Sequence, residues 1–268
     1  MQPVSKEKRP VIYNAGATKL LSFSYPAGKE CFVMHWHERL EILRIKSGEM
    51  EYTLGSHSGV ARAGQAIIIP PRMAHYARAG SSLEYDVLMF DLRYFYNETE
   101  VCKSTLTSIF EGNAVFECLT EDKDIVSSID SVCHGAHDSL EAVGRVYLLL
   151  HLFLTRGIIT LTKGESRGDI RRIVDYIEQN FDNELSTAAL CEHFGYTQGH
   201  FCRKFKKATG LTPVTYIKIY RLEKAFNMLK DGEGSVCEIA EKCGFPDSNY
   251  FTRCFKAHYK FPPTHYKK

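Results

Sequence analysis

Residues 189–206 read ALCEHFGYTQGHFCRKFK, and residues 238–256 read EIAEKCGFPDSNYFTRCFK. Both segments contain a short amphipathic stretch that ends near a glycine, then a polar turn, then a stretch with two phenylalanines four positions apart. The glycines are 49 positions apart and the first phenylalanines are 50 apart, so the second turn is one residue longer. An internal repeat of this consistency indicates one duplicated structural unit.

Each copy predicts a helix-turn-helix motif. Gly195 and Gly244 are suited to the left-handed backbone that ends a helix. The phenylalanines at i and i+4 predict that the second helix of each copy turns this face inward. We therefore expect motifs at about 187–208 and 236–258, joined by a helix over about 213–229.

The outward side of each second helix is basic. Arg203 and Arg253 occupy equivalent positions, two residues after an inward phenylalanine. One basic helix is often only a solvated surface, but a repeated arginine favours a repeated partner. Arginine suits bidentate contact with guanine edges or with phosphates. This pattern indicates a nucleic-acid partner.

The last hundred residues resemble the DNA-binding domain of the AraC/XylS family of bacterial transcription regulators. The resemblance rests on the repeat, on KKATGLTPVTY at 206–216, on RLEKA at 221–225 and on FPPTHY at 261–266. It implies an all-α DNA-binding domain over 169–268. Two recognition helices held about 34 Å apart would read successive major-groove segments of double-stranded DNA.

The resemblance also implies the contact residues. Lys206, Lys207 and Lys256 suit phosphates, which fix register and make binding salt-dependent. The expected DNA-binding set is Gln198, His200, Arg203, Lys204, Lys206 and Lys207 in copy one, and Ser248, Asn249, Tyr250, Thr252, Arg253 and Lys256 in copy two.

Charge differs between the two parts of the chain. Residues 166–268 hold 17 basic and 12 acidic side chains, and the preceding 165 residues hold 17 basic and 20 acidic ones, within a net charge of +2. A basic C-terminal part beside a mildly acidic N-terminal part is consistent with a DNA reader joined to a different kind of domain.

The N-terminal part predicts an all-β barrel with added helices. Short β-rich runs separated by glycine and proline occur at 20–25, 40–45, 50–54, 65–69 and 85–92. Strands at this spacing are typical of an antiparallel barrel or jelly roll. The fold class is therefore mixed, with a barrel domain over 1–121 and the helical DNA-binding domain at the other end.

HWHERLEILRIKSG at 35–48 and GQAIIIPPRMAH at 64–75 resemble the two motifs of cupins. The resemblance implies a site of three histidines and one carboxylate, His35, His37, Glu41 and His75, which suits a divalent transition metal. Arg72 stands where cupins usually have glycine, and Ala79 where asparagine is common. The arginine weighs against a metal, so a vacant or pocket-lining site is the alternative, and no cofactor is required.

The cupin resemblance further implies a small organic effector, such as a sugar or related metabolite, inside the barrel. Aromatic side chains could stack on a sugar ring, although each is equally suited to the core. The expected effector-binding residues are His35, Trp36, His37, Glu41, Tyr52, Arg72 and His75.

Residues 122–161 predict a helical dimerisation segment, followed by a linker at 162–168. The second of its helices, at about 139–156, has Leu140, Val143, Tyr147, Leu150 and Leu154 at helical spacing and is apolar nearly all round. Such a helix needs more than one packing partner. Packing on the barrel alone is one possibility, and the resemblance implies a homodimer.

We therefore expect a cytoplasmic, effector-controlled activator that contacts RNA polymerase. The nine cysteines, without an apolar leader or an apolar run of membrane length, are consistent with a reducing compartment and no membrane partner. Two alternatives remain: a metal-dependent cupin enzyme fused to a DNA-binding domain, and an alkyl-accepting repair regulator with an activated cysteine. The second is weaker because no cysteine lies in a recognisable activating motif.

Overall fold

The computed structural model describes residues 8–11, 18–92, 105–109, 113–135, 139–162 and 168–266. The chain forms two compact units that meet in sequence at residues 167 and 168. Most of the expected linker, residues 163–167, lies outside the described residues. Each unit has its own core, and no helix in the described ranges is long and apolar enough to cross a membrane.

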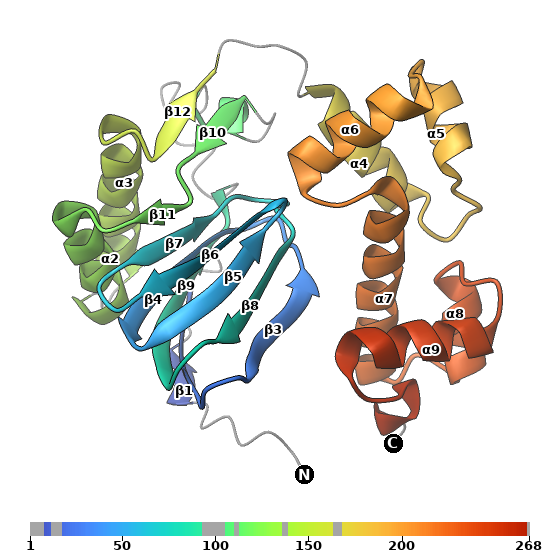
Figure 1. Ribbon diagram of the computed structural model, residues 1–268, viewed down its shortest axis with the longest axis horizontal. Coiled ribbons are helices and arrows are strands. Elements are labelled where there is room, and N and C mark those ends of the chain that lie inside the picture. Colours follow the sequence, from blue (N-terminus) through green and yellow to red (C-terminus); the bar gives the residue numbers. More distant parts are fainter. Residues whose placement is uncertain are drawn as a thin grey trace. The chain divides into compact units, whose positions relative to one another are not determined.

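The first unit contains two large β-sheets (Figure 1). In both sheets neighbours such as β2 and β9, or β5 and β8, pair antiparallel. The six-stranded sheet has the order β1 (Lys8–Val11), β2 (Thr18–Tyr25), β9 (Leu83–Phe90), β4 (Leu40–Ser47), β7 (Ala66–Ile69) and β11 (Leu119–Thr120). The four-stranded sheet has the order β3 (Glu30–His35), β8 (His75–Ala79), β5 (Glu49–Leu54) and β6 (His57–Arg62).

Side-chain alternation gives the six-stranded sheet two buried faces. On β4, Leu43 and Ile45 pack into the core shared with the four-stranded sheet, whereas Leu40 and Ile42 pack on the opposite side. The continuous apolar run of β7 has the same explanation, because alternate isoleucines enter the two cores. The predicted cupin-like β fold is confirmed. The runs now assigned to β3, β6 and β8 were not predicted as strands.

Helices α2 (Lys123–Gly135) and α3 (Ser139–Thr155) cover the outer face of this sheet (Figure 1). Helix α3 buries one side against the sheet and leaves apolar side chains exposed on another. Leu140 is 82% exposed and Leu148 is 64% exposed, while Ala142, Val146 and Phe153 are buried. The apolar pattern runs nearly around the helix, so spacing alone could not identify the side that packs on the sheet.

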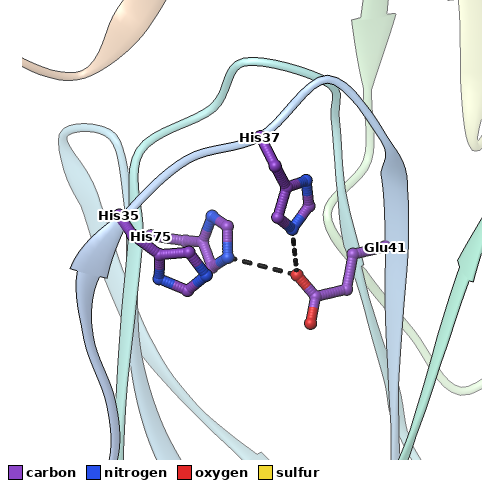
Figure 2. A group of neighbouring side chains, drawn as sticks. All are labelled: His35, His37, Glu41 and His75. Atoms are coloured by element: carbon purple, nitrogen blue, oxygen red, sulfur yellow. Dashed lines mark hydrogen bonds and ion pairs between the residues drawn. The ribbon is translucent and has the colours of Figure 1, made fainter. Parts of the chain in front are cut away.

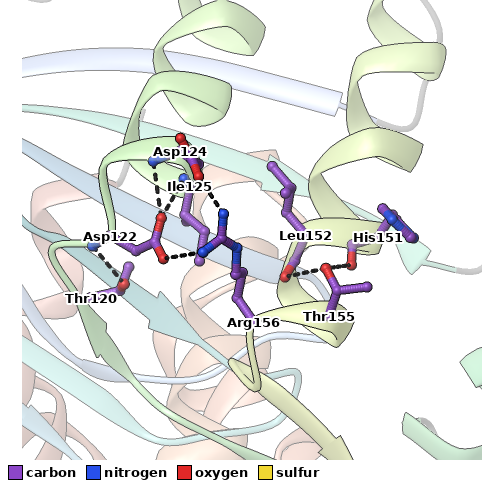
Figure 3. A network of polar contacts seen from close by, with 8 residues as sticks. All are labelled: Thr120, Asp122, Asp124, Ile125, His151, Leu152, Thr155 and Arg156. Atoms are coloured by element: carbon purple, nitrogen blue, oxygen red, sulfur yellow. Dashed lines mark hydrogen bonds and ion pairs between the residues drawn. The ribbon is translucent and has the colours of Figure 1, made fainter.

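A polar network joins the start of α2 to the end of α3 (Figure 3). Asp122 accepts hydrogen bonds from the backbone N–H groups of Asp124 and Ile125, which caps α2. Arg156 then pairs with Asp122 at 3.7 Å and also with Asp124. The arginine thereby fastens the two helices at one end, close to the two-stranded sheet of β10 (Ala114–Phe116) and β12 (Ile159–Leu161).

A second polar contact fastens α2 to the sheet. The guanidinium of Arg44 on β4 donates to both carboxylate oxygens of Asp130, at 2.9 and 3.2 Å. This paired geometry is the strong form of an arginine–carboxylate contact. Arg44 therefore lies on the helix side of the sheet and not in the barrel interior.

The second unit is helical and contains both predicted motifs. The long helix α7 joins α4–α6 at one end to α8 and α9 at the other (Figure 1). Its helices are α4 (Gly168–Gln179), α5 (Thr187–Phe194), α6 (Gln198–Thr209), α7 (Pro213–Asp231), α8 (Val236–Lys242) and α9 (Ser248–Tyr259), followed by the 3-10 helix η2 (Pro263–Tyr266).

Local sequence determines where these helices begin and end. Ser235 and Glu238 form a capping box at the start of α8, and Ser186 caps α5. Gly195 has a φ of 70° where α5 ends, and Gly244 has a φ of 71° just after α8. These are the two turn glycines of the repeat, so the motif boundaries follow directly from its residues.

Helix α7 supplies core residues to both motifs. Tyr216 and Ile217 are buried near its start, and Leu222, Ala225 and Leu229 are buried against α8 and α9. Tyr220 on the same helix is half-buried, and its ring lies against that of Phe181 with centroids 5.4 Å apart.

Candidate functional site

The first candidate site lies in the β unit, where four polar side chains converge (Figure 2). His35 ends β3, His37 follows it, Glu41 lies on β4 and His75 begins β8. One potential ligand atom from each residue lies within 4.8 Å of all the others. The structure therefore brings together the four residues that the cupin motifs indicated. They come from two sheets and from a stretch of 41 residues, His35 to His75.

The three histidines are oriented in the same way. The Nδ1 atom of each ring lies 2.8–3.1 Å from a backbone carbonyl oxygen two residues away. Because a carbonyl can only accept, each Nδ1 carries the hydrogen. The Nε2 atom is then the nitrogen that faces the other ligand atoms. This arrangement fixes the orientation of each ring, as outer-shell bonds do in metal centres.

Glu41 connects two of the rings. Its Oε2 lies 2.7 Å from Nε2 of His37 and 3.1 Å from Nε2 of His75. Burial disfavours its ionised form, but the hydrogen bonds and positive charge of the two histidines outweigh burial and lower the pKa of Glu41 below its usual value. Near neutral pH the cluster therefore contains a buried carboxylate. This donor set has the composition of a three-histidine, one-carboxylate metal site.

Arg72, one of the expected effector-binding residues, lies in the turn beside this cluster. Its φ is 63°, which explains why glycine is the usual residue in the cupin motif. Its backbone N–H donates to the carbonyl of His37, and its Nε donates to Glu38 at 2.7 Å. Glu38 therefore neutralises the positive charge of Arg72, which on the sequence alone weighs against a bound metal. The turn also holds His37 in place.

The predicted aromatic residues have different positions. Trp36 is only 5% exposed, so it is a core residue with little surface for a ligand. Tyr52 is half-buried and packs across Gly59, where an added Cβ would lie 2.7 Å from its hydroxyl oxygen. Phe32, which sequence reasoning did not identify, lies against His75 with ring centroids 5.5 Å apart.

The second candidate site consists of the two recognition helices, α6 and α9. The structure exposes the side chains of Arg203, Lys206 and Lys207 on α6 and of Arg253 and Lys256 on α9. The buried phenylalanines at i and i+4 lie on the opposite side of each helix. The remaining predicted residues are exposed at Gln198, His200, Asn249 and Tyr250, and half-buried at Lys204, Ser248 and Thr252.

The two helices are not equivalent in detail. Lys204 donates to the hydroxyl of Tyr196 at 2.8 Å and lies over its ring, so it stabilises the turn of the first motif. Arg203 lies close to Gly199, and a Cβ added at Gly199 would be 3.6 Å from the guanidinium. In copy two, Asn249 occupies the position equivalent to Gly199, and the aromatic Tyr250 follows it.

Sequence reasoning missed a third set of contacts in this unit. Arg221 of α7 donates to the backbone carbonyls of Phe181 and Asn183, both at 2.7 Å. These carbonyls belong to the connection between α4 and α5. The sequence indicates Arg221 only as part of the RLEKA segment. Its partners are backbone carbonyls of distant residues, and no sequence pattern identifies such a partner.

Several cysteines are unsuited to nucleophilic chemistry. Burial raises the pKa of the Cys31 and Cys133 thiols to about 12, and that of the Cys118 and Cys243 thiols to about 11. A neutral thiol is a poor nucleophile. At these four positions the structure therefore argues against an alkyl-accepting role.

Comparison with protein families identifies both units. The model of the helix-turn-helix domain matches residues 190–268, and the model of the cupin domain matches residues 21–90. Both parts of the chain are therefore similar to the AraC family of transcription regulators. The chain combines a cupin-like N-terminal unit with a helical unit that contains the duplicated helix-turn-helix motif.

Curated relatives agree with this similarity. The chain is 32% identical over 143 residues to the HTH-type transcriptional activator RhaS of Salmonella schwarzengrund, an alignment that covers 52% of this chain and 51% of the relative. It is 24% identical over 246 residues to RhaS of Mannheimia succiniciproducens, covering 88% and 90% of the two chains. In the alignment of higher identity, the chain thus spans about half the length of its relative.

The fold also matches a solved structure along most of the chain. ToxT of Vibrio cholerae superposes with a TM-score of 0.60 and 12% identity, covering 93% of this chain and 97% of ToxT. At this identity the match establishes the fold alone. It agrees with a chain composed of a cupin-like unit followed by a helical DNA-binding unit.

Proposed function

We propose that this chain is a homodimeric, cytoplasmic transcription activator of the AraC family whose DNA binding is controlled by a small molecule held in the cupin domain. One observation carries the proposal. Arg203 and Arg253 are both exposed at equivalent positions of two recognition helices in one chain. The same chain contains a second unit whose interior gathers a buried polar cluster. A reader and a sensor in one polypeptide are the minimum for a ligand-controlled switch.

The recognition helices would read two successive major-groove segments. Arg203 and Arg253 would contact base edges, and Lys206, Lys207 and Lys256 would contact phosphates. Duplexes selected from a random library by the wild-type chain would serve as probes. Replacing Arg203 or Arg253 by alanine should weaken specific binding by about 1–3 kcal/mol.

Lys230→Ala is the matched control, because Lys230 is exposed in the last turn of α7 and not on a recognition helix. Mobility-shift titrations should give this variant wild-type affinity. Wild-type affinity for both arginine variants would contradict the assignment of the recognition faces.

The effector would be a small, hydroxyl-rich molecule such as a sugar or a related metabolite. The cluster offers histidine and carboxylate groups that hydrogen-bond to hydroxyls, and Phe32 provides an aromatic face beside His75. One ToxT structure is described as bound to an unsaturated fatty acid. A charged, polar cluster favours a more polar ligand here. Screening metabolites for a change in operator affinity would test this class, and a response only to fatty acids would contradict it.

The cluster would also hold a divalent transition metal. His35, His37, His75 and Glu41 are the proposed ligands, since their orientation leaves each Nε2 directed at the cluster. A bound metal would supply open coordination positions for oxygen atoms of the effector. Titration of metal-stripped protein with Co²⁺, followed by visible absorption, should show one site per chain. His37→Ala should abolish it, and His57→Ala, an exposed histidine at an edge strand, should leave it intact.

An enzyme that carries a DNA-binding domain is the rival function. The named relatives are transcriptional activators, which favours a regulator. Turnover of a metabolite by the metal-loaded chain, lost in His37→Ala, would support the rival. We expect a metabolite to change DNA affinity without being consumed.

Dimerisation would use the exposed side of α3. Leu140 and Leu148 lie two turns apart there and are largely solvent-exposed in the single chain. Pairing with the same helix of a second chain would remove both from water. Leu148→Glu should therefore convert a dimer into a monomer in sedimentation experiments, and Thr155→Glu, at another exposed position of α3, should not. A contact with RNA polymerase would follow from promoter binding, and transcription assays in vitro would test it.

A further inference from the structure

The connection between α4 and α5 contacts the second helix-turn-helix motif directly. Phe181 in this connection packs against the core formed by α7, α8 and α9. The same connection leads into Ser186, which caps α5, the first helix of the first motif. A segment that starts one motif is thus seated on the other, and α7 is not the sole link between them.

Arg221 holds this connection in place. It lies near the middle of α7, and its two donated hydrogen bonds reach the carbonyl oxygens of Phe181 and Asn183. Both distances are 2.7 Å, typical of charge-assisted hydrogen bonds. Two contacts from one planar group to carbonyls two residues apart fix the position and the direction of the turn. A lysine has three donors on a single nitrogen and lacks the rigid planar fork, so it could not fix two carbonyls in this geometry.

Gly244 completes the contact from the side of the second motif. A Cβ at this position would lie 2.7 Å from the carbonyl oxygen of Asp182 and 2.9 Å from that of Phe181. It would also lie 3.0 Å from the guanidinium of Arg221. Gly244 thus has two constraints, a left-handed φ and close approach of another backbone. Its counterpart Gly195 shares only the first, since an added Cβ there meets nothing within 4 Å.

This difference breaks the symmetry of the repeat. The two glycines look equivalent in sequence, but only the second is pressed against a segment from the other motif. We propose that Arg221, Gly244 and the carbonyls of residues 181–183 form an inter-motif joint that fixes the relative orientation of the two recognition helices. Arg221 is a positioning residue that contacts no DNA. The proposal rests on the two-segment DNA reading described above.

The joint predicts how the protein responds to DNA spacing. Two linked binding modules gain affinity only when their geometry allows both to engage at once. A rigid joint restricts the pair to one spacing, whereas a loose joint spreads the recognition helices over several spacings. Loosening should therefore weaken binding at the preferred spacing, strengthen relative binding at other spacings and leave a single half-site unchanged.

The test uses the full-length chain and a duplex selected from a random library. Footprinting would define the two contacted segments, and derivatives would carry one or two base pairs added or removed between them, or only one segment. Arg221→Met removes both donors and keeps the apolar stem, and Gly244→Ala adds the obstructing Cβ. Lys224→Met is the matched control, because Lys224 lies on the same helix and over the ring of Phe181 without donating to the connection.

Arg221→Met and Gly244→Ala should each bind the preferred spacing about tenfold more weakly than wild type, with a flattened dependence on spacing. Arg221→Lys should restore part of the dependence, and Lys224→Met should keep all of it. If Arg221→Met loses the same factor of affinity for the two-segment and the one-segment duplexes, Arg221 only stabilises the fold and the proposal is wrong. An unchanged spacing profile in Arg221→Met would also overturn the proposal.

A second measurement needs no DNA. Spin labels introduced through non-canonical residues at Lys207 and Ala257, both exposed, would report the distance between α6 and α9. Wild type should give a narrow distribution that broadens in Arg221→Met, and equal widths would overturn the joint. If the wild type selects no duplex at all, the proposed function fails, and the distance distribution still decides whether the joint exists.

Discussion

Replacing His258 should remove a pH dependence from the stability of the DNA-binding unit. His258 lies in the last turn of α9, and its Nε2 is buried without a hydrogen-bond partner among the described residues. Burial, together with the charges of Lys218 and Lys260, lowers its pKa from 6.5 to about 4. The folded state therefore favours the neutral ring, and the unfolded chain binds the proton more readily.

The sign and size follow from this difference. Between about pH 6.5 and pH 4 the unfolded chain binds more protons, so stability present above pH 6.5 is lost as the pH falls toward 4. At about 1.4 kcal/mol per pKa unit, the loss between pH 7.5 and pH 5 would be about 2 kcal/mol. Solvent screening of a partly exposed ring reduces this to roughly 1 kcal/mol.

Urea unfolding followed by circular dichroism at 222 nm would measure the helical unit at both pH values. The chain has one tryptophan, the buried Trp36, so its fluorescence separately reports unfolding of the β unit. His258→Phe should reduce the pH-dependent loss by roughly 1 kcal/mol, while His200→Gln, at an exposed position, should leave it unchanged. The reasoning is refuted if His258→Phe loses as much stability as wild type between the two pH values.

Three further changes test other parts of the structure. Lys260 has a φ of 68° at the end of α9, where the first motif has Gly210, so Lys260→Gly should stabilise the helical unit by about 1 kcal/mol in the same urea assay; a loss of stability would contradict the strain argument. Ser235→Ala removes half of a capping box and should destabilise by about 1 kcal/mol, whereas Thr197→Ala should have a smaller effect because Thr197 makes no side-chain cap bond. Arg44→Met breaks the paired contact with Asp130 and should lower the stability reported by Trp36 fluorescence by about 1–2 kcal/mol, with no shift in the helical transition.

Local patterns predicted the helical unit well because its determinants are short-range. Caps, turn glycines and phenylalanines at i and i+4 act within a few residues, so Ser235 and Gly195 could be assigned their roles from neighbours alone. The cupin motifs likewise named four side chains that the structure brings within 4.8 Å. Strand alternation and a short turn suffice to direct His35 and His37 toward one site.

Long-range packing could be predicted less well from the sequence. The apolar pattern of α3 could not show that Leu140 faces solvent, because nearly every side of that helix is apolar. From the sequence, Trp36 between two site histidines is equally suited to ligand stacking and to the core, and only tertiary packing leaves it 5% exposed. Arg72 looked like an unpaired cation at the site, although Glu38 neutralises it from the neighbouring strand connection.

The sequence by itself determined the duplicated helix-turn-helix, the cupin motifs and the residues that each presents, because periodicity, capping and turn geometry are encoded locally. Only the tertiary structure decided which of the two repeat glycines is enclosed, since the space for a Cβ at Gly244 is filled by the carbonyls of Phe181 and Asp182, more than 60 residues away in the sequence. The same holds for Arg221, whose partners are backbone oxygens. Every residue carries such an oxygen, so no side-chain pattern identifies the ones that folding places beside an arginine.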